Sequence, residues 1–255
     1  MRASTATRLL IGVVAFVGVA ALLAIVRGDP EARELVGGFL LVAVTIGGLL
    51  WLSRRYRVAP RRASFKDQAR LAGLRAEPGD PFGLLDSPFT LFGRAASVRD
   101  IENTASGMRN GVWTVVADSW YAPTSDPQLD DYVRHTCVLT DTPAWWPDLS
   151  VVPEGLRSRL RATFAMPDIR TESEAFNRRF EVASADPRFA SAFLDARMMR
   201  WLLDREPGVG FEIRGARLMT FRPRATASLD DVALALDLHD ALSARIPSVV
   251  RAAPI

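Results

Sequence analysis

The sequence predicts an α+β protein in which an N-terminal transmembrane helical hairpin precedes a cytoplasmic domain with an antiparallel sheet and flanking helices. Two long uncharged apolar runs lie near the N-terminus, at residues 9–26 and 35–52. Further along, turn dipeptides join segments typical of strands, and helical segments interrupt them without a regular strand–helix–strand alternation. That order favours antiparallel pairing, because parallel neighbours need long crossover connections.

Each apolar run has 18 residues, and a helix of that length spans about 27 Å, close to the roughly 30 Å hydrocarbon core of a bilayer. Neither run contains Asp, Glu, His, Lys or Arg, the residues that mark ion or proton paths. We therefore expect two membrane spans that serve as an anchor. A cleaved signal peptide would lack the second run, and a soluble helical hairpin would have polar faces.

The arginines around these runs predict the orientation of the anchor. Residues 28–34, between the runs, are too few for a domain, so both chain ends lie on one side. Because Lys and Arg near spans stay in the cytoplasm, we expect a two-span plasma-membrane protein with both termini cytoplasmic. Five arginines follow the second run and are expected to contact anionic lipid headgroups: Arg54, Arg55, Arg57, Arg61 and Arg62.

A sequence pI of about 9.6 suggests a nucleic-acid partner, but the charge distribution argues against one. Residues 1–62 hold nine arginines and three acidic residues, whereas residues 63–255 hold 23 basic and 26 acidic residues. A nucleic-acid-binding domain carries its excess positive charge on the folded surface that makes the contacts. Since the larger part of this chain is mildly acidic, we expect no nucleic-acid partner.

The chain is predicted to have four parts. Residues 1–62 form the hairpin with its basic flank, and residues 63–92 form a juxtamembrane connector. Within this connector, the amphipathic segment 64–76 is expected to lie on the membrane surface. Residues 93–248 form the α+β domain, and residues 249–255 form a C-terminal tail that we expect to fray.

Two turn dipeptides define the expected hairpins of the domain. Asn110-Gly111 readily adopts the positive φ angles of a type I′ turn, and Gly215-Ala216 occupies the corresponding place in a second hairpin. The strands are expected at about 97–109, 112–121, 132–141, 148–153 and 176–184, with the second hairpin over 210–223.

Three helices are expected in the same domain, at 154–164, at 185–206, and from Ser228 to Arg245. Asp186 is a suitable N-cap for the second helix, and Pro187 suits its first turn. The pair Asp230-Asp231 is favourable at the start of the last helix.

Three segments resemble a known group of proteins: "ENTASG", the hairpin "NGVWTVVADSWY" and "FNRRFEVASADPRFASAFLDARMMRWLL". They are similar to uncharacterised actinobacterial two-span membrane proteins with a cytoplasmic domain of unknown function. The resemblance covers most of residues 97–221 and implies the architecture described above. It implies no catalytic residue.

The candidates for chemistry are few. Cys137 and His135 lie on one face of an expected strand, but side chains two residues apart are about 7 Å from each other, which is too far for activation of the thiol. We therefore expect a core thiol. A zinc site from nitrogen and sulfur donors would need both residues together with His239 and a carboxylate. We predict neither a metal site nor a cofactor.

Trp145-Trp146, between two prolines, is the most distinctive local feature. Two adjacent tryptophans in a loop are typical of a surface that contacts headgroups or a partner protein. The alternative is one ring in the core and one partly covered ring.

These observations favour a membrane-anchored cytoplasmic binding or scaffolding module rather than an enzyme. Its expected partners are the lipid bilayer and either another membrane protein or a second copy of the chain. Two alternatives stay open: an accessory subunit of a membrane transport or secretion complex, and an enzyme whose acidic site is dispersed along the sequence.

Overall fold

The computed structural model describes residues 63–92, 98–122, 132–156, 166–224 and 230–252. The chain divides into Met1–Ala63 and Ser64–Ile255, and the fold below is that of the second part. The predicted spans at 9–26 and 35–52, and the five arginines that follow them, lie outside the described residues. Within the ranges given above, no helix is long and apolar enough to cross a bilayer.

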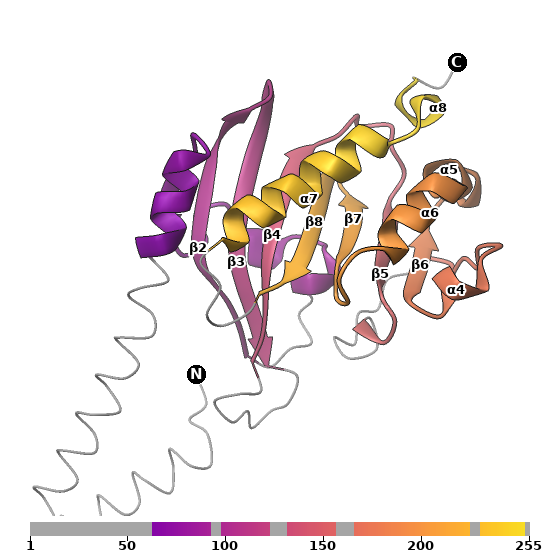
Figure 1. Cartoon of the computed structure of the whole chain (residues 1–255), viewed down its shortest axis with the longest axis horizontal. Helices are drawn as coiled ribbons and strands as arrows, with labels where there is room; N and C mark the ends of the chain where they lie inside the picture. Colours follow the sequence, from indigo (N-terminus) through magenta and orange to yellow (C-terminus); the bar gives the residue numbers. More distant parts are fainter. Residues whose placement is uncertain (1–62, 93–97, 123–131, 157–165, 225–229, 253–255) are drawn as a thin grey trace, which may run out of the picture. The chain divides into compact units, whose positions relative to one another are not determined.

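An eight-stranded antiparallel sheet forms the centre of the domain, which confirms the α+β part of the predicted fold class (Figure 1). The spatial order is β1-β2-β3-β4-β8-β7-β5-β6, so the C-terminal hairpin inserts between β4 and β5. The strands are β1 (Arg75–Pro78), β2 (Val98–Arg109), β3 (Val112–Ala122), β4 (Val133–Asp141), β5 (Leu149–Pro153), β6 (Phe180–Ser184), β7 (Gly210–Arg214) and β8 (Arg217–Pro223).

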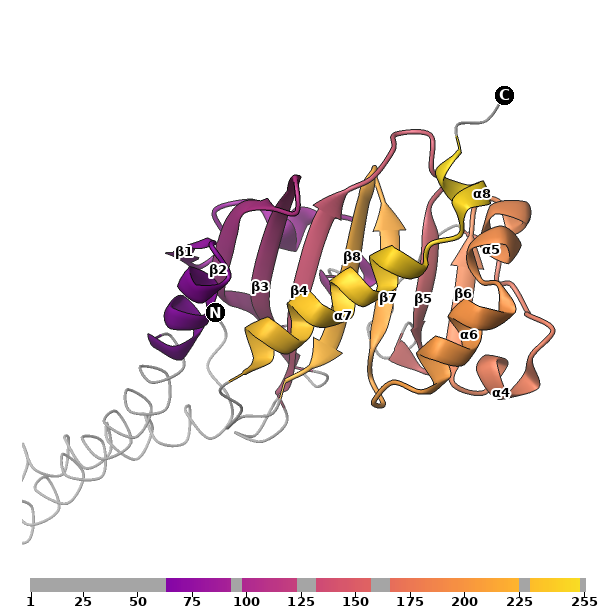
Figure 2. The ribbon, with the colours of Figure 1, turned by 45° about the horizontal axis from the view of Figure 1, so that its top comes forward.

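Helices cover one face of this sheet. The longest, α7 (Asp231–Arg245), crosses β4 and β8, and α5 (Pro187–Phe193) and α6 (Ala196–Leu203) lie over the β5–β6 side (Figure 2). The short helices α4 (Glu174–Asn177) and α8 (Ser248–Arg251) pack against β6 and α5 respectively. Apolar side chains from this layer and from the sheet form the larger core, with Phe193, Phe211 and Leu242 among its members.

Residues 84–92, which contain no α-helix, cover the other face of the sheet. Two short 3-10 helices, η1 (Leu84–Asp86) and η2 (Thr90–Phe92), lie on it. Phe89 and Phe92 are buried there, together with Val115, Cys137 and Phe221 of the sheet. The sheet is therefore buried on both faces, as expected from strands with long apolar runs.

Both predicted turns are confirmed. Asn110 and Gly111 have φ angles of 52° and 78°, and Gly215 and Ala216 have 52° and 60°. Two consecutive residues with positive φ define the type I′ turn, whose twist matches that of the flanking strands. The hairpins join β2 to β3 and β7 to β8.

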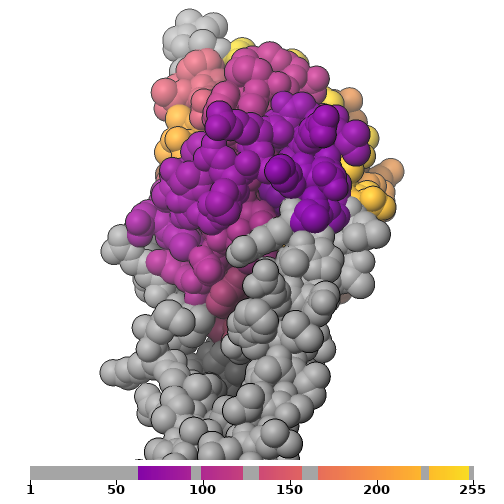
Figure 3. Space-filling view, turned by 90° about the vertical axis from the view of Figure 1, so that its left-hand side faces the viewer, coloured from indigo at the N-terminus to yellow at the C-terminus, as the bar shows by residue number. Residues whose placement is uncertain are grey.

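Residues 63–92 differ from the prediction of a juxtamembrane connector. Residues 63–71 are helical, but Phe65 and Ala69 pack against Val116 and Val138 of the sheet, so the apolar side of this helix faces the domain. The following residues form the edge strand β1 and then the cover of the opposite face. Figure 3 shows the indigo segment lying directly against the magenta strands at this edge. The same apolar pattern that suits a membrane surface also suits a sheet.

The predicted helix at 185–206 is two helices. Asp186 caps α5 as predicted, but a second cap follows, since the Asp195 side chain accepts a hydrogen bond from the backbone N–H of Met198 at 2.7 Å. Leu194, between the helices, leaves the helical conformation. The chain therefore starts a new helix at Ala196, which turns Trp201 and Leu202 into the core.

The C-terminal end also differs from the prediction in part. Residues 248–251 form α8 instead of a frayed tail, and Val250 packs into the larger core. Most of the predicted helix at 154–164, together with Ser228, lies outside the described residues.

Candidate functional site

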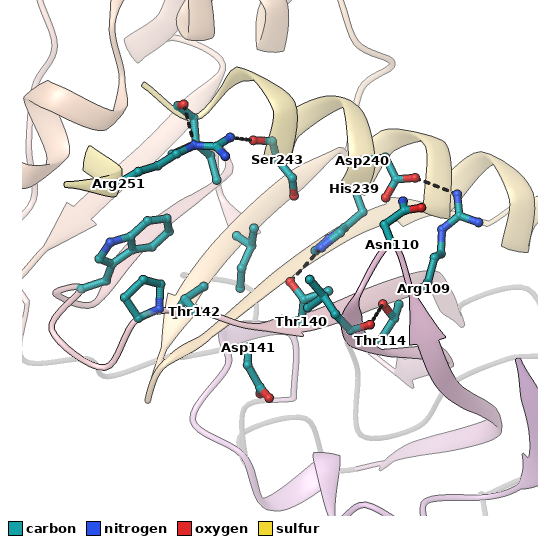
Figure 4. A pocket seen from close by; sticks show the side chains of 15 residues that line it. Arg109, Asn110, Thr114, Thr140, Asp141, Thr142, His239, Asp240, Ser243 and Arg251 are labelled. Carbon is teal, nitrogen blue, oxygen red and sulfur yellow. Dashed lines mark hydrogen bonds and ion pairs between the residues drawn. The ribbon is translucent and has the colours of Figure 1, made fainter. Parts of the chain in front are cut away.

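A pocket of about 390 Å³ lies on the helical face of the sheet. Its walls come from the β2–β3 turn, the end of β4 with the loop after it, and the C-terminal half of α7 (Figure 4). Arg251 of α8 closes one side. The volume is within the range of small-molecule sites.

His239 forms the centre of the pocket and joins α7 to the sheet. Its Nε2 lies 3.0 Å from Thr140 Oγ1 and its Nδ1 lies 3.0 Å from Thr220 Oγ1. Burial lowers the pKa of His239 to about 4, against a smaller opposing effect of Asp240. The neutral ring therefore donates to one threonine and accepts from the other, and both nitrogens are engaged.

Arginines bound the pocket at its two ends. Arg109 Nη2 lies 2.7 Å from Asp240 Oδ2, which connects the end of β2 to α7. At the other end, Arg251 donates to the backbone carbonyls of Ser243 and Ile246 (Figure 4). Carbonyls at a helix C-terminus carry partial negative charge, so this arginine also stabilises the end of α7.

Three polar atoms of pocket residues are buried without a hydrogen-bond partner in the described protein. They are Arg109 Nε, Thr142 Oγ1 and Trp146 Nε1. A buried polar group left unpaired costs about 1–3 kcal/mol, and most such groups in folded proteins have a partner. Because so little of the surface of these atoms is accessible, they lie behind the pocket surface and do not by themselves define a ligand site.

The rest of the lining is largely apolar. Val112, Leu218 and Ile246 contribute aliphatic surface, and Pro143 and Trp146 contribute the wall nearest Arg251. Rings from α5 hold Trp146 in place, with centroid distances of 5.9 Å to Phe189 and 6.1 Å to Phe193. The pocket therefore combines a rigid apolar wall with polar groups at its ends.

Comparison with known proteins adds one distant likeness. Neither a protein-family model nor a curated protein matches this sequence. Among solved structures, the crystal structure of the mycobacterial trehalose monomycolate transport factor A, TtfA, is similar with a TM-score of 0.42 and 13% sequence identity. The match covers 74% of this chain and 96% of that one. A likeness of this size supports no conclusion about function.

The two predicted contact tryptophans have different environments. Trp146 is 8% exposed and lines the pocket, whereas Trp145 is 46% exposed. This is the arrangement of one core ring and one partly covered ring. A contact of Trp145 with lipid or with a partner protein stays a prediction.

The three candidate zinc donors lie on opposite faces of the sheet. His135 and Cys137 point to the face covered by η1 and η2, whereas His239 bonds to threonines on the helical face. Burial raises the pKa of the Cys137 thiol to about 12 and lowers the pKa of His135 to about 4. Cys137 is therefore a core thiol, as expected. Among the residues with described side chains, no group of three His, Cys, Asp or Glu is arranged to hold a metal ion.

Several acidic residues are buried, and each holds parts of the fold together. The Glu212 carboxylate accepts hydrogen bonds from Thr90 N and Oγ1, both at 2.6 Å, and from Ser150 Oγ at 2.7 Å. Asp231 Oδ1 lies 3.0 Å from Arg222 Nη1. Asp231 is buried at the start of α7, where its negative charge also stabilises the helix N-terminus. Asp118 lies 2.8 Å from Arg224. These contacts give the buried carboxylates structural partners.

The sequence patterns point to only part of this pocket. It singled out Trp146 and His239, although for other reasons, and it gave no role to Arg109, Asp240 or Thr142. Arg109 and Asp240 are 131 positions apart. No local pattern in a single sequence relates residues at that separation.

Proposed function

We propose that this chain is a membrane-anchored binding module whose folded domain takes a ligand in the pocket beneath α7. The observation that carries the proposal is the pocket of about 390 Å³, whose apolar wall includes Trp146, held by Phe189 and Phe193, and whose lining includes Arg109 and Arg251. A ligand that covers this apolar wall removes it from water, which favours the occupied state.

The pocket lies at the C-terminal end of α7, whereas the first helix of the domain contacts the start of α7. Gln68, in the second half of the helix at 63–71, accepts a hydrogen bond from the Val232 N–H at the start of α7 at 3.0 Å. The pocket adjoins residues 239–246, at the other end of α7.

Binding is favoured over catalysis by the state of the groups that line the pocket. Ser243 is a hydroxyl near His239, one helical turn apart, but both ring nitrogens of His239 are engaged with threonines. A general base needs a free nitrogen within hydrogen-bond reach of the proton that it removes. In this arrangement His239 holds α7 to the sheet and has no free nitrogen to remove a proton.

The test of this function is the ligand content of the full-length protein. The protein is purified from native membranes into lipid nanodiscs, and bound small molecules are identified by native mass spectrometry. Ser243→Trp fills the pocket from α7, and Ala244→Trp places the same ring on the exposed neighbouring position as a matched control. The wild type and the control are expected to carry a molecule that Ser243→Trp lacks. Identical ligand content in all three would refute the binding role of the pocket.

The membrane anchor is tested separately. Full-length protein is expected in the membrane pellet after lysis without detergent and in the soluble fraction only when detergent is present. Recovery in the aqueous fraction without detergent would contradict the anchor while leaving the pocket experiment intact.

A second candidate is an accessory subunit of a membrane transport or secretion complex. Large apolar side chains favour this role because they are exposed at the same end of the domain: Met108 and Trp113 on the β2–β3 hairpin and Trp145 after β4. Exposed apolar surface of this kind is typical of protein contacts. Crosslinking in intact membranes followed by mass spectrometry tests this candidate, which requires a polytopic partner bound through the hairpin.

A further inference from the structure

The lining of the pocket also indicates the class of molecule that it takes, an inference that rests on the proposed function. We propose that the ligand is uncharged and apolar, a small molecule that covers the lining with a hydrocarbon chain or ring. Three observations carry the inference: the apolar groups of the lining, the pairing of its charged groups and the engagement of its polar groups.

Apolar side chains from separate parts of the domain meet in the pocket. They come from the β2–β3 hairpin, the loop after β4, β8 and the end of α7, and they are Val112, Pro143, Trp146, Leu218 and Ile246. Val112 is 41% exposed, so part of this surface is accessible to water. Removing apolar surface from water is favourable in proportion to its area, so a ligand gains affinity by covering these side chains.

The charged groups of the lining balance one another. Arg109 Nη2 lies 2.7 Å from Asp240 Oδ2, and the exposed Asp141 lies 3.7 Å from Arg217, which is outside the lining. Arg251 donates to backbone carbonyls at the end of α7, where the helix carries partial negative charge. Within the lining, two arginines stand against two aspartates, so the pocket has no net charge.

This pairing disfavours an ion in the pocket. A charged group that leaves water loses its hydration, and the loss is recovered only where a counter-charge is available. An anion would have to draw Arg109 away from Asp240, and a cation would have to draw Asp240 away from Arg109. Either exchange leaves one side chain of the pair without its partner, whereas a neutral molecule leaves the pair intact.

Most polar side chains of the lining are also engaged or lie below its surface. Both ring nitrogens of His239 are bonded, one of them to Thr140, and Thr114 Oγ1 donates to a backbone carbonyl of its own strand. The Thr142 hydroxyl oxygen and the Trp146 indole nitrogen have almost no accessible surface. The remaining polar side chains of the described lining are Asn110 and Ser243. A neutral hydroxyl or carbonyl on the ligand is compatible with these two, but the larger part of the ligand meets apolar surface.

Three matched photoreactive probes test the ligand class. Each has a six-carbon chain with a diazirine, and the chain ends in a hydroxyl, a carboxylate or an ammonium group. Full-length protein in nanodiscs of zwitterionic lipid is irradiated with each probe at the same free aqueous concentration, and labelled residues are mapped by mass spectrometry. The alcohol is expected to label the pocket lining at least about tenfold more than either ion, because neither ion finds an uncommitted counter-charge there.

Four variants locate the effect. Ser243→Trp fills the pocket and is expected to abolish labelling of the lining by the alcohol, whereas Ala244→Trp should retain it. Val112→Thr keeps the shape of the side chain but replaces a methyl group by a hydroxyl, so labelling should fall by about two- to fourfold. Val249→Thr makes the same change at a 68% exposed position outside the lining and should leave labelling almost unchanged.

The proposal has outcomes that would overturn it. Labelling of the lining by either ion that equals or exceeds that by the alcohol would do so, as would the absence of labelling by the alcohol. Labelling that Val112→Thr and Val249→Thr reduce equally would show that the apolar lining does not determine binding.

Native mass spectrometry of the same protein distinguishes this failure from that of the proposed function. A bound molecule that is charged at pH 7 and is lost in Ser243→Trp would refute the uncharged class and leave the binding role intact. Identical ligand content in the wild type and Ser243→Trp would refute the binding role itself.

Discussion

Arg109 Nη2 lies 2.7 Å from Asp240 Oδ2, although 131 positions separate the two residues in the chain. The pair joins the tip of the β2–β3 hairpin to the middle of α7, and the pocket lies beside it (Figure 4). Any change that moves α7 on the sheet therefore also changes the pocket. The predictions below concern the contacts that hold this arrangement.

The two buried histidines predict a loss of stability in mild acid. Burial lowers the folded-state pKa of His135 and of His239 from 6.5 to about 4. The unfolded chain therefore binds more protons between these values, and stability falls as the pH falls from about 6.5 to about 4, by on the order of 3 kcal/mol for each histidine. Urea unfolding at pH 7, 5.5 and 4.5 measures this effect.

A variant assigns part of that loss to the pocket. His239→Gln retains hydrogen-bonding groups near Thr140 and Thr220 but does not titrate. The stability of this variant is expected to depend less steeply on pH than that of the wild type between pH 6.5 and 4. An unchanged slope would contradict the neutral buried state of His239.

Glu212 is predicted to hold η2 to the sheet. Glu212→Gln weakens its bonds to Thr90 and Ser150 and removes the charge beside Arg214, so we expect a loss of at least about 2 kcal/mol in the free energy of unfolding. Hydrogen exchange should rise first in residues 84–92. Glu77→Gln changes an exposed pair at 3.9 Å and serves as the control, with an expected effect below about 0.5 kcal/mol.

Asp195 is predicted to be necessary for the break between α5 and α6. Asp195→Ala removes the N-cap bond to the Met198 N–H and is expected to lower the free energy of unfolding by about 1 kcal/mol. Asp204→Ala, an exposed position just after α6, should have a much smaller effect. Equal effects of the two substitutions in thermal denaturation would show that the cap contributes nothing.

Cys137 is predicted to be unreactive in the folded protein. Burial raises the pKa of its thiol to about 12, and the thiolate is the form that reacts. Iodoacetamide at pH 8 should therefore leave Cys137 unmodified in native protein and modify it fully in urea. Mass spectrometry of the intact protein measures the extent. Rapid modification without denaturant would restore Cys137 as a candidate nucleophile.

Local signals account for what could be predicted of the fold. The two hairpins were predictable because Asn110-Gly111 favours positive φ at both turn positions and Gly215 adopts it freely, whereas the positive φ of Ala216 is imposed by the hairpin around it. The break at Asp195 had a local signal as well, an aspartate three residues before Met198, but continuous apolar periodicity predicted one helix across it. The cap at Asp195 predicts a break, whereas the apolar periodicity predicts one continuous helix. In the structure the break is present, and Trp201 and Leu202 of the second helix pack into the core.

The segment at 64–76 shows where a pattern is ambiguous. Its apolar residues predict that one side is covered, but the pattern does not distinguish a bilayer from a sheet. Phe65 and Ala69 face Val116 and Val138, which are more than 40 positions away in the chain. Hydrophobic burial is non-directional, so the identity of the covering surface depends on which surface the rest of the fold brings near.

The sequence by itself determined the expectation of two membrane spans, the strands of the two hairpins, the type I′ turn at Asn110-Gly111 and the antiparallel α+β class, because these follow from runs, periods and dipeptides within a few residues. Only the tertiary structure decided the strand order, the burial of residues 63–92 and the meeting of Arg109, Asp240 and Trp146 around one pocket. The physical reason is that short-range backbone preferences act along the chain, whereas burial and ion pairing act through space between segments that one sequence does not relate to each other.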